Sequence, residues 1–382
     1  MSANAATATF LAVTDRLTLS TPLAAPRSDE RDDARALRLW LWVVAALVFL
    51  MVIVGGAVRL TESGLSITEW KPVTGVVPPL SHAAWLAEFE KYKQIPQYRE
   101  LFPDTDLSRF QAIYTWEWGH RLLGRLIGIA FAIPLVLFWW MGRLPASLTP
   151  KLLAILGLGA LQGAVGWWMV ASGLSGRVEV AQERLAIHLL LASLTLAAIV
   201  WIAVGLERGS GTATRAPRRL RIIAACLLAF IFVQIGLGGL VAGLRGGLTY
   251  NTWPLMDGRF VPPLDHLTRL SPYWSNLLDN VTTVQFAHRM TAYCVLMLAI
   301  LQVIAVKRAI GRGEAYRRAH IMFGLVFLQV IAGITTLVLV VPVSIALVHQ
   351  GLAMLVLIAA TIHLRRLFAD PHAARFTSSS LS

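Results

Sequence analysis

Residues 39–58 read LWLWVVAALVFLMVIVGGAV and contain no charged side chain. A helix needs roughly 20 apolar residues to cross a bilayer core about 30 Å thick, so this stretch is long enough for one transmembrane helix. Further runs of the same kind follow along the chain. The pattern predicts an all-α polytopic membrane protein with eight transmembrane helices, near 39–58, 120–140, 152–171, 185–206, 221–243, 284–306, 320–341 and 346–364.

The composition agrees with a membrane location. The chain has 382 residues, of which 56% are hydrophobic and 14% charged, and its mean hydropathy is +0.64. A soluble domain is about half apolar and about a quarter charged. The net charge of +13 would suit a nucleic-acid partner, but the basic residues lie between apolar runs and not on a polar domain. We therefore expect membrane lipid around the protein and no nucleic acid.

The basic residues also predict the orientation. Lysine and arginine are denser in one alternating set of segments, 1–38, 141–151, 207–221, 307–318 and 364–382, than in the other. By the positive-inside rule, both termini of this multi-pass protein are expected in the cytoplasm, with the membrane being a bacterial inner (plasma) membrane. The long loops 59–119 and 244–283 then face the opposite side.

The two halves of the chain resemble each other. Gly55-Gly56-Ala57-Val58 and then Gly64-Leu65-Ser66 in the first half match Gly238-Gly239-Leu240-Val241 and then Gly247-Leu248-Thr249 in the second. Each half has an even number of spans, so both have the same orientation in the membrane. This internal repeat predicts two pseudo-symmetric four-helix bundles.

The repeat suggests a division of the chain. The predicted parts are a disordered cytoplasmic tail (1–37), an N-terminal four-helix half (38–206), a cytoplasmic linker (207–220), a C-terminal four-helix half (221–366) and a second cytoplasmic tail (367–382). The first tail lacks the apolar segment of a signal peptide. Cys226 and Cys294 both fall in apolar runs, so neither a disulfide nor a zinc site is expected.

Four histidines lie near the outer ends of the even-numbered spans: His120, His188, His288 and His349. An ionisable side chain in a span is costly and indicates function. A single histidine is more simply explained by a hydrogen bond to a neighbouring helix, but four at matching depth favour two pairs of axial haem ligands. A dinuclear copper or iron centre would need more ligands in one bundle. The other histidines are not expected to bind metal; these are His82, His266, His320, His363 and His372.

Three arginines accompany these histidines. Arg121 and Arg289 directly follow a candidate ligand, and Arg125 lies one helical turn further on. A guanidinium group pairs well with carboxylates, so we expect all three to bind haem propionates. The alternative is that their side chains only extend to the membrane interface.

One difference between the halves points to chemistry. Glu117 lies three residues before His120, whereas Gln285 occupies the matching place before His288. A carboxylate one turn from a haem ligand can move protons or stabilise positive charge, which an amide does less well. The alternative is that Glu117 caps a helix or pairs with Arg121. Glu62 and Glu69 are further candidates, although solvated loop residues explain them as well.

Several segments together resemble the haem A synthase family. They are GGAVRLTESGLS (55–66), WEWGHRLLGR (116–125), FAHR (286–289) and VHQG (348–351), and the resemblance covers residues 38–366. The motif SITEWKP (66–72) and the long first loop are similar to the proteobacterial and mitochondrial branch. Another bacterial branch has a cysteine pair in this loop, and this chain has none there.

The resemblance implies a reaction and a set of roles. The family oxidises the C8 methyl of haem O, its substrate, to a formyl group, which gives haem A for cytochrome c oxidase. It implies that His120 and His188 flank the substrate haem iron, that His288 and His349 ligate the iron of a haem b cofactor, and that Glu117 is catalytic. An unidentified electron donor, haem O synthase and oxidase assembly factors are implied as partners.

Two other functions stay open from the residues alone. A di-haem b electron-transfer cytochrome would use the same ligands without converting its haem, and a haem exporter or chaperone would release its haem unchanged. Small residues such as those in Gly236-Leu237-Gly238-Gly239 permit close helix packing within or between protomers, so a homo-oligomer is also open.

Overall fold

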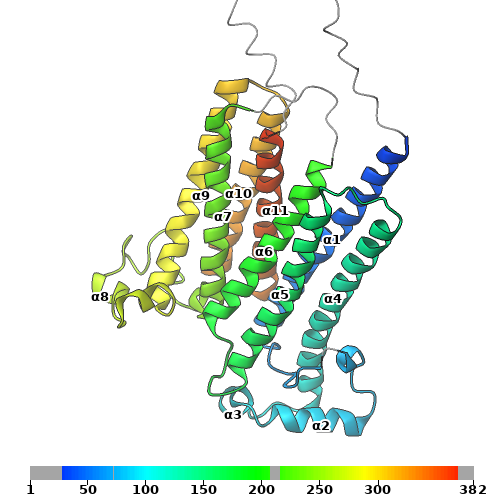
Figure 1. The fold of residues 1–382 in the computed structure, drawn as a ribbon. Helices are drawn as coiled ribbons and strands as arrows, with labels where there is room; N and C mark the ends of the chain where they lie inside the picture. The colour runs from blue at the N-terminus through cyan, green and yellow to red at the C-terminus, as the bar shows by residue number, and fades with distance from the viewer. Residues whose placement is uncertain (1–27, 72, 207–215, 369–382) are drawn as a thin grey trace, which may run out of the picture.

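The computed structural model describes residues 28–71, 73–206 and 216–368. Within these ranges all regular elements are helical, and eight helices are long and apolar enough to cross a membrane. This confirms the predicted all-α membrane fold (Figure 1). The eight helices are α1 (Ser28–Leu60), α4 (Leu107–Trp140), α5 (Thr149–Gly173), α6 (Gln182–Gly205), α7 (Arg218–Gly243), α9 (Val281–Ile310), α10 (Glu314–Val338) and α11 (Val343–Leu367).

The central helices are α1, α6, α7 and α11; α6 and α11 each pack against the other three and so join the two halves of the chain. Side chains from these helices are fully buried at the centre, among them Leu196, Val200, Leu227 and Leu357. Helices α4 and α5 flank this group on one side, and α9 and α10 flank it on the other (Figure 1). The flanking pairs differ, because α4 and α5 contact each other much less than α9 and α10 do.

The loops that follow α1 and α7 lie at the same end of the helices (Figure 1). The first contains η1 (Thr74–Val76), α2 (His82–Tyr92) and α3 (Pro96–Leu101), and the second contains η2 (Gly246–Leu248), α8 (Leu264–Leu267) and η3 (Tyr273–Leu277). The start of α1 and the end of α11 lie at the opposite end, as an even number of spans requires. The pseudo-symmetric relation between the halves stays a prediction.

The structure corrects the predicted start of the second span. Helix α4 begins at Leu107, well before residue 120, so His120 lies in its interior and not in its first turns. The Asp106 carboxylate caps the helix and accepts the Arg109 N–H at 2.7 Å. The early part of α4 packs Phe110 and Tyr114 on aromatic residues of α2, so the loop stabilises this extension.

The predicted division into tails, halves and a linker stays a prediction, but two helix starts bear on its boundaries. Helix α1 already includes residues 28–37, and Leu37 is buried in the central core, which holds this part of the helix against the rest of the protein. Helix α7 begins at Arg218, inside the predicted linker. Residues 1–27, 207–215 and 369–382, which include the rest of these segments, lie outside the described residues.

The small residues of α7 are used inside the chain. A Cβ added to Gly239 would lie 2.9 Å from the Cα of Ala186, and one added to Gly236 would lie 3.2 Å from Leu190. Both neighbours belong to α6. Glycine at these positions therefore lets α6 and α7 pack closely at the boundary between the two halves.

Candidate functional site

Each of the four candidate ligands rests on a glycine of the preceding membrane helix. An ideal Cβ on these glycines would lie 2.8–3.3 Å from an imidazole atom, which is closer than ordinary van der Waals contact. The same close approach recurs in all four helix pairs, and a larger residue would require the imidazole ring to shift. The pairs are His120 on Gly55, His188 on Gly166, His288 on Gly238 and His349 on Gly333.

The histidines also associate in two pairs. His120 lies close enough to His188 for an electrostatic interaction, and His288 to His349, so each half contains one pair. Among the described residues, no group of three or more His, Cys, Asp or Glu side chains is placed to hold a metal ion. Two histidines per site fit a haem iron, which needs only axial ligands from the protein. The buried Nδ1 atoms of His288 and His349 have no hydrogen-bond partner, so these two nitrogens are available to a bound group.

Three glutamines that the sequence analysis did not single out touch the histidine rings. Gln162 Nε2 lies 3.2 Å from His188 Nδ1, and Gln234 Nε2 lies 3.2 Å from His288 Nε2. Gln329 Nε2 is 3.4 Å from His349 Nε2. In each case the glutamine stands one helical turn before the glycine under the same ring. The recurring spacing Gln-x-x-x-Gly was the signal in the sequence.

Glu117 is buried and ties α4 to the first loop. Its side chain is 3% exposed. Its Oε2 accepts hydrogen bonds from the Ser66 hydroxyl at 2.7 Å and from the Ile67 N–H at 2.8 Å. Its Oε1 accepts from Arg121 Nη2 at 2.6 Å. Arg121 in turn donates to the carbonyl oxygens of Ile67 and Glu69. The pairing with Arg121, which was the alternative explanation of Glu117 from the sequence, is therefore present, and both carboxylate oxygens have partners.

Gln285 and Arg289 make the corresponding connection in the second half with opposite polarity. Gln285 Nε2 donates to the carbonyl oxygens of Gly246 (2.7 Å) and Thr249 (2.6 Å), whereas Glu117 accepts from its loop. Arg289 donates to the carbonyl oxygens of Tyr250 (2.6 Å) and Thr252 (2.9 Å). Each side chain thus matches its loop: the first loop offers hydrogen-bond donors to Glu117, and the second offers acceptors to Gln285.

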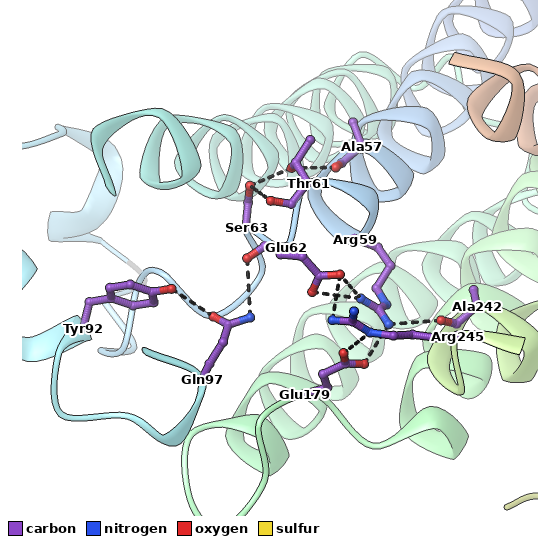
Figure 2. Close-up of polar contacts among 10 residues, drawn as sticks. All are labelled: Ala57, Arg59, Thr61, Glu62, Ser63, Tyr92, Gln97, Glu179, Ala242 and Arg245. Atoms are coloured by element: carbon purple, nitrogen blue, oxygen red, sulfur yellow. Dashed lines mark hydrogen bonds and ion pairs between the residues drawn. The ribbon is translucent and has the colours of Figure 1, made fainter. Parts of the chain in front are cut away.

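The other candidate residues lie at the same end of the helices as the two long loops. Arg125 Nη2 donates to the Lys71 carbonyl oxygen at 2.8 Å, so all three candidate arginines contact loop carbonyls; binding of haem propionates stays a prediction. Glu69 forms ion pairs with Lys71 (2.5 Å) and Lys91 (2.9 Å). Hydrogen bonds from these ammonium groups hold the pKa of Glu69 below its usual value. Glu62 pairs with Arg59 and Arg245 (Figure 2).

The remaining histidines are not part of the four-histidine pattern. His363 is fully buried, and its Nε2 lies 2.9 Å from Gln302 Nε2. His320 Nδ1 lies 3.0 Å from the Tyr316 carbonyl oxygen in its own helix. His82 and His266 lie in the loop helices α2 and α8, and His372 is outside the described residues. Cys226 and Cys294 are free thiols.

The fold and the site together define a class: multi-pass helical membrane proteins that carry paired intramembrane histidines seated on glycine. Within it, the chain belongs to the COX15-CtaA family, "Cytochrome oxidase assembly protein", whose model matches residues 38–361. This confirms the family suggested by the motifs.

Curated relatives cover almost the whole chain. The "Heme A synthase" of Beijerinckia indica is 60% identical over 334 residues, which cover 87% of this chain and 93% of the relative. The protein of the same name from Rhodopseudomonas palustris is 53% identical over 360 residues, covering 94% and 98%. That of Methylobacterium sp. is 54% identical over 348 residues, covering 90% and 96%.

Proposed function

We propose that the chain is a haem A synthase, which oxidises the C8 methyl group of haem O to a formyl group and so produces haem A for cytochrome c oxidase. The proposal is supported by relatives of that name over nearly the whole length. The structural observation that carries it is the set of four glycine-seated histidines in two pairs. A porphyrin iron needs two such axial ligands, and two pairs suit one substrate haem and one cofactor haem.

The N-terminal half is the proposed substrate site, with His120 and His188 as ligands. A substrate must enter and its product must leave, and here the flanking helices α4 and α5 contact each other little. An open pocket of about 670 Å³ lies on the same side, lined mainly by apolar side chains and by Gly119, next to His120. An isoprenoid-bearing haem arriving from the bilayer would find an apolar entrance there.

The C-terminal half is the proposed cofactor site, with His288 and His349 as ligands of haem b. Its flanking helices α9 and α10 are closely packed, which suits a group that stays bound. When bound there, haem b supplies one-electron transfer between the substrate site and an external redox partner. That electron donor, haem O synthase and oxidase assembly factors are the proposed partners.

Glu117 is the proposed catalytic group. The methyl group becomes a formyl group through two successive hydroxylations, each of which uses one O2, two electrons from the donor and two protons and releases one water; the geminal diol then loses water to leave the aldehyde. Positive charge that develops beside the ring can be stabilised by a buried carboxylate, which can also accept a proton. Arg121 and the backbone of Ile67 hold the carboxylate in place. Arg121, Arg125 and Arg289 lie on the loop side, where they are proposed to meet propionates after releasing loop carbonyls.

The proposed location is a bacterial inner membrane with both termini in the cytoplasm. The eight spans and the common end of the two long loops agree with this orientation. The density of Lys and Arg on the other side supports it.

The test is to load the purified full chain with haem O, supply an electron source and oxygen, and chromatograph the extracted haems. Conversion to haem A is expected. Haem O left unchanged under these conditions would favour an exporter or chaperone. Glu117→Gln should keep both haems and leave haem O unconverted.

A matched variant separates catalysis from loop anchoring. Ser66→Ala removes one hydrogen bond to Glu117 but keeps the carboxylate. It should still convert haem O if Glu117 is catalytic. Equal loss of haem content in both variants would instead mean that Glu117 only anchors the loop.

A further inference from the structure

The seats of the four histidines are alike except at one position. Glutamine stands one turn before the glycine at Gln162, Gln234 and Gln329, and each of these amides contacts its histidine ring. The residue one turn before Gly55 is Met51. Among the described residues, the His120 imidazole accordingly has no hydrogen-bond partner, although Gly55 lies as close to it as the other glycines do to their histidines.

Met51 occupies the place that an amide would take. Its side chain lies against α4 next to Gly124, where an added Cβ would be 3.3 Å from the Met51 methyl carbon. Gly124 is one turn beyond His120, so Met51 packs beside the ligand-bearing turn. A thioether is only a weak hydrogen-bond acceptor, whereas an amide offers both a donor and an acceptor.

The difference matters for a metal ligand. A neutral imidazole that binds iron through one nitrogen carries a proton on the other, and a partner for that proton orients the ring and makes it a stronger ligand. The amide atom at each ring nitrogen is Nε2, and the Oε1 atoms of Gln162, Gln234 and Gln329 are buried without a partner. Turning each amide so that Oε1 and Nε2 exchange places puts an acceptor at the ring, which is the arrangement that a ring proton requires. Loss of such a partner weakens metal binding about 10- to 100-fold.

We propose that Met51 is a positioning residue that makes His120 the weakly held ligand of the substrate iron, so that His120 releases the iron during turnover while His188, His288 and His349 stay bound. The proposal rests on the proposed function in taking haem O as the group held by the N-terminal half. It accounts for how an iron with two histidines gains a free coordination position in one half and not in the other.

Carbon monoxide binding to the reduced, haem-loaded full chain tests this, read by absorption spectroscopy. The wild type should bind carbon monoxide at one of its two haems. Met51→Gln should lower the carbon monoxide affinity of that haem about 10-fold or more, because the amide would hold His120. Met51→Leu keeps the site apolar and should bind carbon monoxide as the wild type does. A change in Met51→Leu as large as that in Met51→Gln would overturn the proposal.

A second, converse variant keeps the proposal testable even where Met51→Gln fails to fold. Gln234→Met removes the amide from His288 and should create carbon monoxide binding at the second haem. Gln302→Met is the control for the substitution, because Gln302 contacts His363 and none of the four candidate ligands. No gain in Gln234→Met would contradict the proposal. Haem A formation is measured separately, so wild-type carbon monoxide binding without haem A would refute the proposed function and leave the role of Met51 standing.

Discussion

Glu62 and Arg245 occupy the same position in the two sequence repeats and form an ion pair with each other, with 3.0 Å between Oε1 and Nη2. The match of residues 55–66 with 238–249 runs without a gap and aligns these two residues. Both have left-handed backbone conformations, with φ of 56° and 52°. Two side chains of the same charge at this repeated position would repel each other, whereas here the two halves present opposite charges.

Two more charges complete this contact between the halves (Figure 2). Arg59 Nη2 lies 2.8 Å from Glu179 Oε2, and Glu179 also pairs with Arg245. Arg59 further donates to the carbonyl oxygen of Ala242, the residue at its own position in the second repeat. Alternating charges thus bridge the end of α1, the α5–α6 loop and the end of α7.

Reversing one charge in this cluster should weaken the contact between the two halves. Glu62→Arg would leave three cations around one carboxylate, and we expect a loss of about 1 kcal/mol in unfolding free energy, since the side chains are partly exposed and screened. Thermal unfolding in detergent at low salt measures the effect. The pair itself is tested by a double-mutant cycle with Glu62→Gln and Arg245→Gln, whose combined loss should be smaller than the sum of the two single losses. Strictly additive losses would show that the two side chains do not act as a pair.

The glycine seats predict a specific effect on haem content. Gly333→Ala would place a Cβ 2.8 Å from His349 Cε1, so the ring must move and the C-terminal half should lose its haem. Gly324→Ala lies on the same helix, where a Cβ meets nothing within 4 Å, and should keep full haem content. Alanine favours a helix over glycine by roughly 1 kcal/mol, so helix propensity cannot cause the loss. Equal haem-to-protein ratios in the two variants would refute the ligand role of His349.

The hydrogen bonds that Gln285 donates predict that a carboxylate cannot replace its amide. Gln285→Glu would point a carboxylate at the carbonyl oxygens of Gly246 and Thr249, and both oxygens would lose their hydrogen-bond donor. We expect a destabilisation of about 1–3 kcal/mol and faster proteolysis of the 244–280 loop. Gln94→Glu, at an exposed position, is the control and should be neutral. Unchanged stability of Gln285→Glu would contradict the hydrogen-bond assignment.

The lysine–glutamate cluster on the first loop predicts a pH dependence. Hydrogen bonds from Lys71 and then Lys91 lower the pKa of Glu69 from 4.5, so its contribution to stability is present above that value and is lost as pH falls through the folded-state pKa. Glu69 in turn raises the pKa of Lys91 above 10.5, and that contribution is lost only as pH rises through the raised value. Unfolding of wild type and Glu69→Gln, compared between about pH 5 and pH 3, should show a smaller acid loss in the variant. The same dependence of unfolding on pH in the wild type and in Glu69→Gln would contradict the stabilising role of the Glu69 ion pairs.

The membrane fold could be predicted from the sequence because apolar runs of sufficient length recur eight times in the described residues. The recurrence of His120 and His188 as His288 and His349 predicts the haem ligands, and that role stays a proposal. The start of α4 could not be predicted from hydropathy, because residues 107–119 are held as helix by packing on the aromatic residues of the loop.

The partners of polar residues were harder to foresee. Gln162, Gln234 and Gln329 are single amides in apolar runs, and only their contacts show that they share a role. Glu62 was visible only as a loop carboxylate, because its partner Arg245 is distant in sequence and joins it only when the two halves pack.

Acid–acetone extraction and chromatography of the haems from the purified chain, expressed together with a haem O synthase, tests the central claim most directly. The account predicts haem A together with haem b or residual haem O. Haem b alone, at two per chain, would contradict it and leave an electron-transfer cytochrome as the better description of this fold.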